Sequence, residues 1–220
     1  MRIVIVEDHL MFREVLRKVC REELRHEVVG EADHGFRALE VIERVAPDLV
    51  LLDLHLPGLD GFGVARELRR RTPHVKILVL SSHCDEFTIY EAERLRVQGF
   101  VDKNTNSVAT LKDAIGALAE GRVWFSEAFQ RTKAALRRDP LAFDKILTER
   151  ERAILILLGV PLSDAEIAQR LGIMADTVEK HRFNILRKLD LETTTELVRY
   201  AREHGFTLTG QSGNAEGLLP

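Results

Sequence analysis

The first half of the chain alternates short apolar runs with amphipathic segments. Five runs of five or six residues are rich in Val, Ile and Leu: 2–6, 28–32, 48–53, 76–81 and 99–103. Strands that are buried on both faces have continuous apolar runs, and strands that alternate with helical segments form parallel sheets. The pattern predicts an α/β domain over residues 1–121, with a doubly wound five-stranded parallel sheet of the flavodoxin type.

The pattern changes at residue 122. Residues 122–145 are charged and contain Pro140, and they predict a linker with a short helix that begins after Ser126 and stops before Asp139. We expect an extended tether between that helix and residue 146.

The region 146–205 has no strand pattern and carries repeated helix-start signals. The segments "TERE", "SDAE" and "TTTE" fit the capping box, in which Ser or Thr precedes Glu by three residues. With a further helix between about residues 175 and 189, they predict a small all-α domain of four helices. Residues 206–220 lack periodicity and are predicted to be a flexible tail.

Composition narrows the class of protein. A length of 220 residues suits one medium domain and one small domain, and the net charge of −3 means that any DNA-binding surface must be local. The apolar runs are too short for a signal peptide or a membrane span. We therefore expect a cytoplasmic, soluble protein without a membrane partner, in which Cys20 and Cys84 are reduced thiols.

Polar residues stand at the ends of the predicted strands. They are the acidic pair Glu7 and Asp8, then Asp53, Ser81 and Lys103. The carboxyl ends of parallel strands form the usual ligand site of such sheets. Three acids there repel one another unless a cation is present, and hard oxygen ligands favour Mg²⁺. A lysine and a hydroxyl in the same cleft suit a phosphoryl group.

In these residues, in "LPGLDG" after Asp53 and in Phe100 before Lys103, the segment resembles a receiver domain of bacterial two-component systems. The resemblance implies that Asp53 accepts a phosphoryl group from a sensor histidine kinase, and that Ser81 and Lys103 bind the acyl phosphate. It also implies that Ser81 and Phe100 act as the switch. The implied Mg²⁺ ligands are Glu7, Asp8, Asp53 and the backbone carbonyl of His55.

The C-terminal region resembles the LuxR-type helix-turn-helix domain of the NarL/FixJ regulators. The matching anchors are Leu147-Thr148, Arg150-Glu151, Glu166-Ile167-Ala168, Leu171-Gly172-Ile173, Thr177-Val178, His181 and Lys188-Leu189. Two positions depart from the family: Met174 replaces the usual N-cap Ser, and Pro161 replaces the usual Gly.

The resemblance implies that the helix at 175–189 enters the major groove of promoter DNA. The predicted DNA-binding residues are Thr177, Glu179, Lys180, Arg182, Phe183, Arg187 and Lys188. Base-edge contacts are expected from Glu179, Lys180 and Phe183. Arg182, Arg187 and Lys188 are expected to contact phosphate or to pack within the domain.

Together the two resemblances predict a phosphorylation-controlled transcription factor. It is not an enzyme beyond its own phosphorylation and autodephosphorylation. RNA polymerase is an expected partner, and a homodimer is expected when the chain is phosphorylated or DNA-bound. Leu197, Val198 and Tyr200 are candidate residues for the dimer contact.

Alternative hypotheses are tied to particular residues. A DNA-binding regulator that is controlled by protein contacts would not need the intact acidic pocket. A haloacid-dehalogenase-like phosphohydrolase would need a second Asp as general acid two residues after Asp53, where His55 stands. A metal site built from His9, His55 and His83 is a further alternative, although His55 and His83 are interpreted as modulators of acyl-phosphate lifetime.

Overall fold

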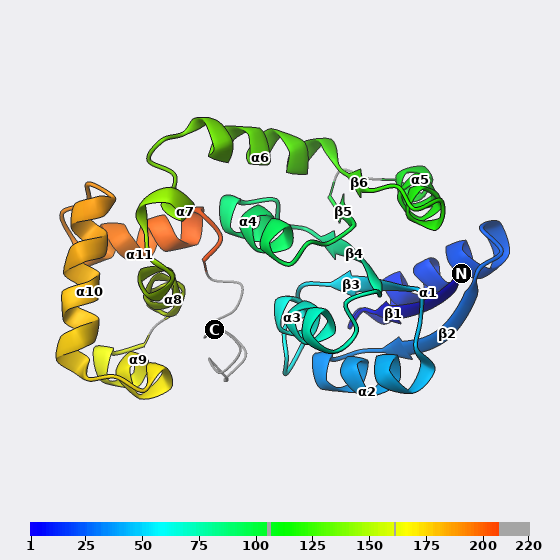
Figure 1. Ribbon diagram of the computed structural model, residues 1–220, viewed down its shortest axis with the longest axis horizontal. Coiled ribbons are helices and arrows are strands. Elements are labelled where there is room, and N and C mark those ends of the chain that lie inside the picture. The colour runs from blue at the N-terminus through cyan, green and yellow to red at the C-terminus, as the bar shows by residue number, and fades with distance from the viewer. Residues whose placement is uncertain (105–106, 161, 207–220) are drawn as a thin grey trace. The chain divides into compact units, whose positions relative to one another are not determined.

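A computed structural model describes residues 1–104, 107–160 and 162–206, and the chain divides into two compact units (Figure 1). Residues 1–84 and 91–131 form the first unit, and residues 85–90 belong with the chain from 132 onward in the second. The first unit contains a sheet, and the second is helical among its described residues.

The sheet is parallel and has the strand order β2-β1-β3-β4-β5-β6. Its strands are β1 (Arg2–Val6), β2 (Glu27–Ala32), β3 (Leu49–Asp53), β4 (Lys76–Ser81), β5 (Gly99–Asp102) and β6 (Trp124–Phe125). The predicted α/β class is confirmed, but the strand count of five was too low. The sixth strand, β6, pairs Trp124 with Gly99 and Phe125 with Phe100. Two residues are too few to give a periodic pattern.

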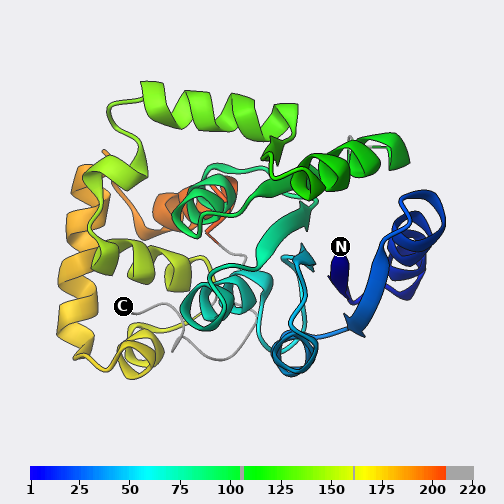
Figure 2. The same cartoon turned by 45° about the vertical axis from the view of Figure 1, so that its right-hand side comes forward.

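Helices cover both faces of the sheet. They are α1 (Leu10–Lys18), its π-helical continuation η1 (Val19–Glu23), α2 (Gly35–Val45), α3 (Gly61–Arg71) and α5 (Val108–Ala119). The remaining helix of this region, α4 (Glu86–Arg94), contains the boundary between the two units. Leu16 of α1 and Ile115 of α5 share one core cluster with alternate residues of the strands, such as Ile3 and Leu51. Figures 1 and 2 show α2 and α3 on the opposite face.

The central strand β3 explains why this sequence reads as continuously apolar. Each side chain from Leu49 to Leu52 is fully buried. Burial of a leucine side chain stabilises the fold by about 1.5–3 kcal/mol. Asp53 ends this strand, so a rigid, deeply packed element fixes its position.

The boundary between the two units falls within the linker helix α6 (Glu127–Arg138). The further helices of the second unit are α7 (Phe143–Ile146), α8 (Glu149–Leu158), α9 (Asp164–Leu171), α10 (Ala175–Lys188) and α11 (Thr194–Glu203). The helix predicted after Ser126 is confirmed as α6, whereas the tether predicted as extended contains α7. All three predicted capping boxes form, at the N-termini of α8, α9 and α11.

The turn between α9 and α10 depends on Gly172, whose φ of 62° lies in the left-handed region. Met174 is the N-cap of α10 and makes no side-chain capping bond. Of the predicted tail, only Phe206 is described, and it is buried. Residues 207–220 and Pro161 lie outside the described residues. Among the described helices, none has the length and apolarity that a membrane span requires.

Candidate phosphorylation site and nucleic-acid interface

The strand ends of the first unit bring together the predicted acidic residues and the lysine. Glu7 follows β1 and Asp53 ends the adjacent strand β3, at the point where the strand order reverses. Lys103 follows β5, and its Nζ lies 2.8 Å from Glu7 Oε2 and 2.8 Å from Asp53 Oδ2. One ammonium group therefore bridges two carboxylates that are 46 residues apart in the chain.

These carboxylates are deeply buried. Glu7 is 0% and Asp53 2% exposed, and the Lys103 side chain is 16% exposed. Burial is the largest cause that raises the pKa of Glu7, the charge of Asp53 adds to it, and Lys103 opposes both. With Asp8 at the same edge, the pocket holds more carboxylates than lysine charges, an arrangement that favours a further cation.

The donor set fits Mg²⁺. Glu7, Asp8, His9 and Asp53 can each direct one ligand atom so that all four atoms lie within 4.8 Å of one another. Asp8 Oδ1 is shielded from solvent and has no hydrogen-bond partner, although His9 Nδ1 lies 2.8 Å away. A shielded carboxylate oxygen without a hydrogen bond is unfavourable unless a cation binds it. Oxygen ligands from a few carboxylates are typical of Mg²⁺.

Asp53 and Ser81 are held by the backbone of the residues that follow them. The His55 N–H donates to Asp53 Oδ1 at 3.2 Å, and the His83 N–H donates to Ser81 Oγ at 3.0 Å. The imidazole rings of His55 and His83 lie 4.7 Å apart beside the pocket. Burial and the neighbouring His83 lower the pKa of His55. His9 joins the acidic group, whereas His55 and His83 contact each other.

Two contacts of the site were not predicted from the sequence. Arg13 of α1 donates from Nη1 to the backbone oxygens of Glu7 and Asp8, at 2.5 and 3.3 Å. The ring of Phe100, which is fully buried on β5, lies 5.1 Å from that of Phe129 at the start of α6. Arg13 is close in sequence to Glu7 and Asp8, whereas Phe100 and Phe129 are far apart, and no local motif signals either contact.

The predicted DNA-binding residues are divided between two environments on α10. Val178 and Ile185 are buried and fix the inner face of the helix. The exposed stripe carries Asp176, Glu179, Lys180, Phe183 and Arg187, and Thr177 is half-buried. The spacing of three and four residues places this stripe on one side of the helix.

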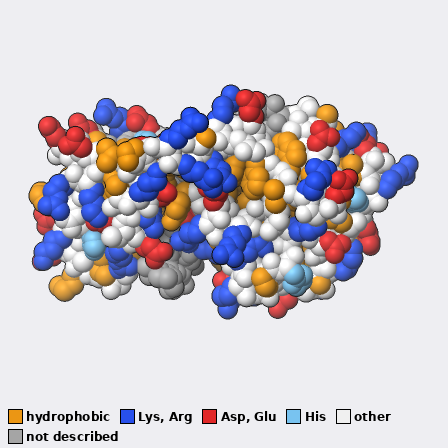
Figure 3. Space-filling model, turned by 45° about the horizontal axis from the view of Figure 1, so that its top comes forward, with side chains coloured by type: hydrophobic (Ala, Val, Ile, Leu, Met, Phe, Trp, Pro, Cys, Tyr) orange, Lys and Arg blue, Asp and Glu red, His pale blue; other side chains and the backbone are white. Residues whose placement is uncertain are grey.

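Two of the predicted cations make ion pairs inside the unit. Arg182 Nη1 lies 2.6 Å from Asp164 Oδ1 at the N-terminus of α9, and Lys188 Nζ lies 2.6 Å from Glu151 Oε2 of α8. Arg182 and Lys188 were expected to contact phosphate or to pack within the domain. Their ion pairs hold α10 against α9 and α8. On the face in Figure 3, basic, acidic and apolar side chains are interspersed, consistent with the low net charge.

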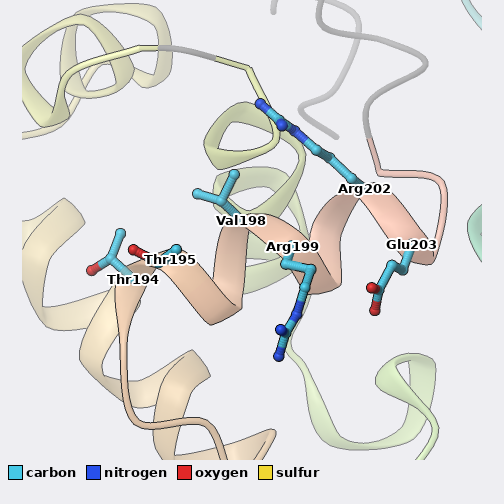
Figure 4. A pocket seen from close by; sticks show the side chains of 6 residues that line it. All are labelled: Thr194, Thr195, Val198, Arg199, Arg202 and Glu203. Carbon is cyan, nitrogen blue, oxygen red and sulfur yellow. The ribbon is translucent and has the colours of Figure 1, made fainter.

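A shallow hollow runs along α11. Thr194, Thr195, Val198, Arg199, Arg202 and Glu203 line it (Figure 4). Of the residues considered for a dimer contact, Leu197 is fully buried in the unit. Val198 lines the hollow and is half-buried, and Tyr200 is half-buried and stacks on His204.

Comparison with known proteins finds one family match in the sheet-containing region and another in the helical region. The response regulator receiver domain family matches residues 3–115, and the luxR family of bacterial regulatory proteins matches residues 145–201. The chain is 30% identical to the transcriptional regulatory protein DegU of Brevibacillus brevis over 226 residues, which cover 93% of this chain and 94% of DegU. It is 31% identical to the response regulator VraR of Staphylococcus epidermidis over 204 residues, or 92% of this chain and 97% of VraR.

The chain belongs to the response regulators that join a receiver domain to a LuxR-type domain. Solved structures share the fold. RcsB of Salmonella enterica, bound to a promoter with the phosphomimetic BeF3−, has a TM-score of 0.66 at 24% identity, over 91% of this chain and 97% of RcsB. A LuxR-family response regulator of Aurantimonas has a TM-score of 0.59 at 30% identity, over 63% of this chain and 98% of that chain.

Proposed function

We propose that phosphotransfer from a sensor histidine kinase to Asp53 of this receiver controls promoter binding by the LuxR-type unit. The observation that carries the proposal is the position of Asp53, which is 2% exposed at the end of the central strand, with Lys103 Nζ 2.8 Å from its carboxylate. Asp8 beside it presents a shielded carboxylate oxygen, 2.8 Å from the ring of the exposed His9, which suits a cation.

Residues of the chain itself perform the transfer. A carboxylate oxygen of Asp53 attacks the phosphorus of a phosphohistidine, the P–N bond breaks, and its electron pair leaves with the imidazole. Lys103 and the hydroxyl of Ser81 then hold the phosphoryl oxygens. Glu7, Asp8, Asp53 and the carbonyl of His55 would hold Mg²⁺, which offsets charge on the transferring group. Autodephosphorylation by water is the only other reaction that we assign to the pocket.

Aromatic side chains connect the phosphorylation pocket to the start of the linker helix, and we expect them to transmit a conformational change. Ser81 ends β4, and the adjacent strand β5 carries Phe100. The ring of Phe100 contacts Phe129, and Phe129 stacks on Phe125 with ring centroids 4.5 Å apart. A change in the position of Phe100 after Ser81 binds the phosphoryl group would therefore disturb the start of α6.

The output side of the proposal uses α10 in the major groove. Its exposed stripe includes Lys180 and Arg187. Ion pairs of Arg182 and Lys188 fix the position of the helix relative to α9 and α8. A homodimer that uses the α11 hollow around Val198 would present two such helices to DNA. RNA polymerase is the expected partner of the bound dimer.

The test measures phosphorylation and DNA affinity in the same preparations. Wild type, Asp53→Asn and Asp33→Asn are incubated with a small phosphodonor and Mg²⁺, run on Phos-tag gels, and titrated with promoter fragments. Asp33 follows strand β2 of the same sheet, but its side chain is 46% exposed, which makes it a matched control. We expect a shifted band and tighter binding in wild type and Asp33→Asn only. Equal affinity with and without the donor would favour control by protein contacts.

A further inference from the structure

We propose that Phe183 recognises the C5-methyl group of thymine in the major groove. The proposal rests on the proposed function, since it assigns a ligand to the exposed stripe of α10. It makes Phe183 a determinant of sequence specificity beside Glu179 and Lys180, whereas Arg187 supplies general affinity for DNA.

The position of Phe183 on the helix is the first observation. The side chain is 65% exposed, although phenylalanine is among the residues that are most often fully buried. Val178 lies five residues before it and Ile185 two residues after it, and both are fully buried. At about 100° per residue, Phe183 points away from these core residues, at the centre of the exposed stripe.

The chemistry around Phe183 is the second observation. Asp176, Glu179, Lys180 and Arg187 surround it on the stripe, and all are exposed. A protein partner that covered Phe183 would also bury several of these charges, which is costly without matched partners. In a major groove Arg187 would lie near phosphate and Lys180 could donate to guanine, and Glu179 can accept a hydrogen bond from the amino group of cytosine.

A phenyl ring neither donates nor accepts a conventional hydrogen bond. The major-groove edges of the base pairs present donors, acceptors and one apolar group, the thymine methyl. Phe183 can therefore discriminate between base pairs chiefly by burying that methyl group. The predicted ligand is a site with a thymine opposite the third turn of α10.

The experiment compares the full-length chain with Phe183→Ala, Phe183→Leu and Leu141→Ala. Leu141 is 68% exposed and lies before α7, so Leu141→Ala removes a comparable exposed apolar side chain outside α10. Binding sites are selected from a random duplex pool with each protein. Each selected thymine is then replaced by deoxyuridine, which removes only the methyl group.

For wild type and Leu141→Ala, we expect one thymine whose replacement weakens binding about fourfold, the effect of burying one methyl-sized group. Phe183→Ala should be insensitive to that replacement, and Phe183→Leu should retain part of the sensitivity. Wild-type binding that is indifferent to every replacement would overturn the proposal, as would equal sensitivity in Phe183→Ala. If Phe183→Ala alters self-association but not methyl sensitivity, the face pairs with a second copy. Failure of wild type to select any duplex would instead contradict the proposed DNA binding itself.

Discussion

The pocket around Asp53 and the helix α10 both depend on charged side chains, but they use them in opposite ways. In the pocket, Glu7 and Asp53 are almost fully buried and share one lysine. On α10, the exposed stripe contains acids, bases and a phenylalanine, Phe183, which is 65% exposed. Buried charges require partners inside the fold, whereas exposed ones leave the choice of partner to the ligand.

This difference means that substitutions in the two regions should have different consequences. In the pocket, a change in charge alters the stability of the fold and the chemistry together, because the same groups serve both. On α10, the exposed stripe can change without loss of stability, while the ion pairs beneath it cannot.

The largest effect is expected for Lys103→Met. Loss of the ammonium leaves the buried carboxylates of Glu7 and Asp53 without their cation, and breaking a buried pair costs about 3 kcal/mol or more. Lys103 is slightly exposed, so we expect about 2–3 kcal/mol in urea unfolding of the metal-free protein. Lys112→Met is the matched control, because its pair with Glu23 is exposed. A similar loss in both variants would show that the buried position has no special cost.

The pH dependence of stability also reports the cost of burying a carboxylate in the pocket. Burial and the charge of Asp53 raise the pKa of Glu7 in the fold, so the fold favours the protonated form of Glu7. The resulting contribution to stability is fully present below the ordinary pKa of a glutamate. That contribution is lost as the pH rises through the raised pKa. We therefore expect Glu7→Gln to be more stable than wild type at neutral pH without metal, and less stabilised by added Mg²⁺.

Thermal unfolding at pH values from 4 to 8, with and without Mg²⁺, measures this difference. Glu14→Gln on α1 removes an exposed carboxylate and serves as the control. If Glu7→Gln lowers the melting temperature of the metal-free protein at every pH, the raised pKa of Glu7 is wrong.

On α10 we expect a separation between affinity and stability. Arg187→Ala should weaken DNA binding and reduce the slope of log affinity against log salt by about 1, as for loss of one phosphate contact. Arg182→Ala breaks the partly exposed pair with Asp164 and should lower the free energy of unfolding by up to about 1 kcal/mol. The salt slope of Arg182→Ala should stay close to that of wild type. A lower slope for Arg182→Ala would place this arginine on phosphate.

The two regions also differ in how far the sequence predicted them. The acidic group, Ser81 and Lys103 were predictable because strand ends meet at one edge of a parallel sheet, and the capping boxes because they are local. The contact of Phe100 with Phe129 arises from tertiary packing, and the bonds of Arg13 are local but belong to no motif. Nothing in the local pattern distinguishes Arg182, which is paired with Asp164, from Arg187, which is exposed. The strand β6 was not predicted because its two residues are too few to show an alternating or apolar pattern.

The smallest effect on DNA binding is expected at the start of α10. Met174 has the extended backbone of an N-cap, with φ −86° and ψ 149°, but it makes no capping bond, and its side chain is 73% exposed. Met174→Ser would supply an oxygen to the N–H groups of the first turn and should stabilise the helical unit by about 1 kcal/mol. Met174→Ala lacks that oxygen and serves as the control in thermal unfolding. Because the change adds no charge, DNA affinity should follow the helix stability and leave the salt slope unchanged. A changed slope would mean that residue 174 itself lies against the DNA backbone.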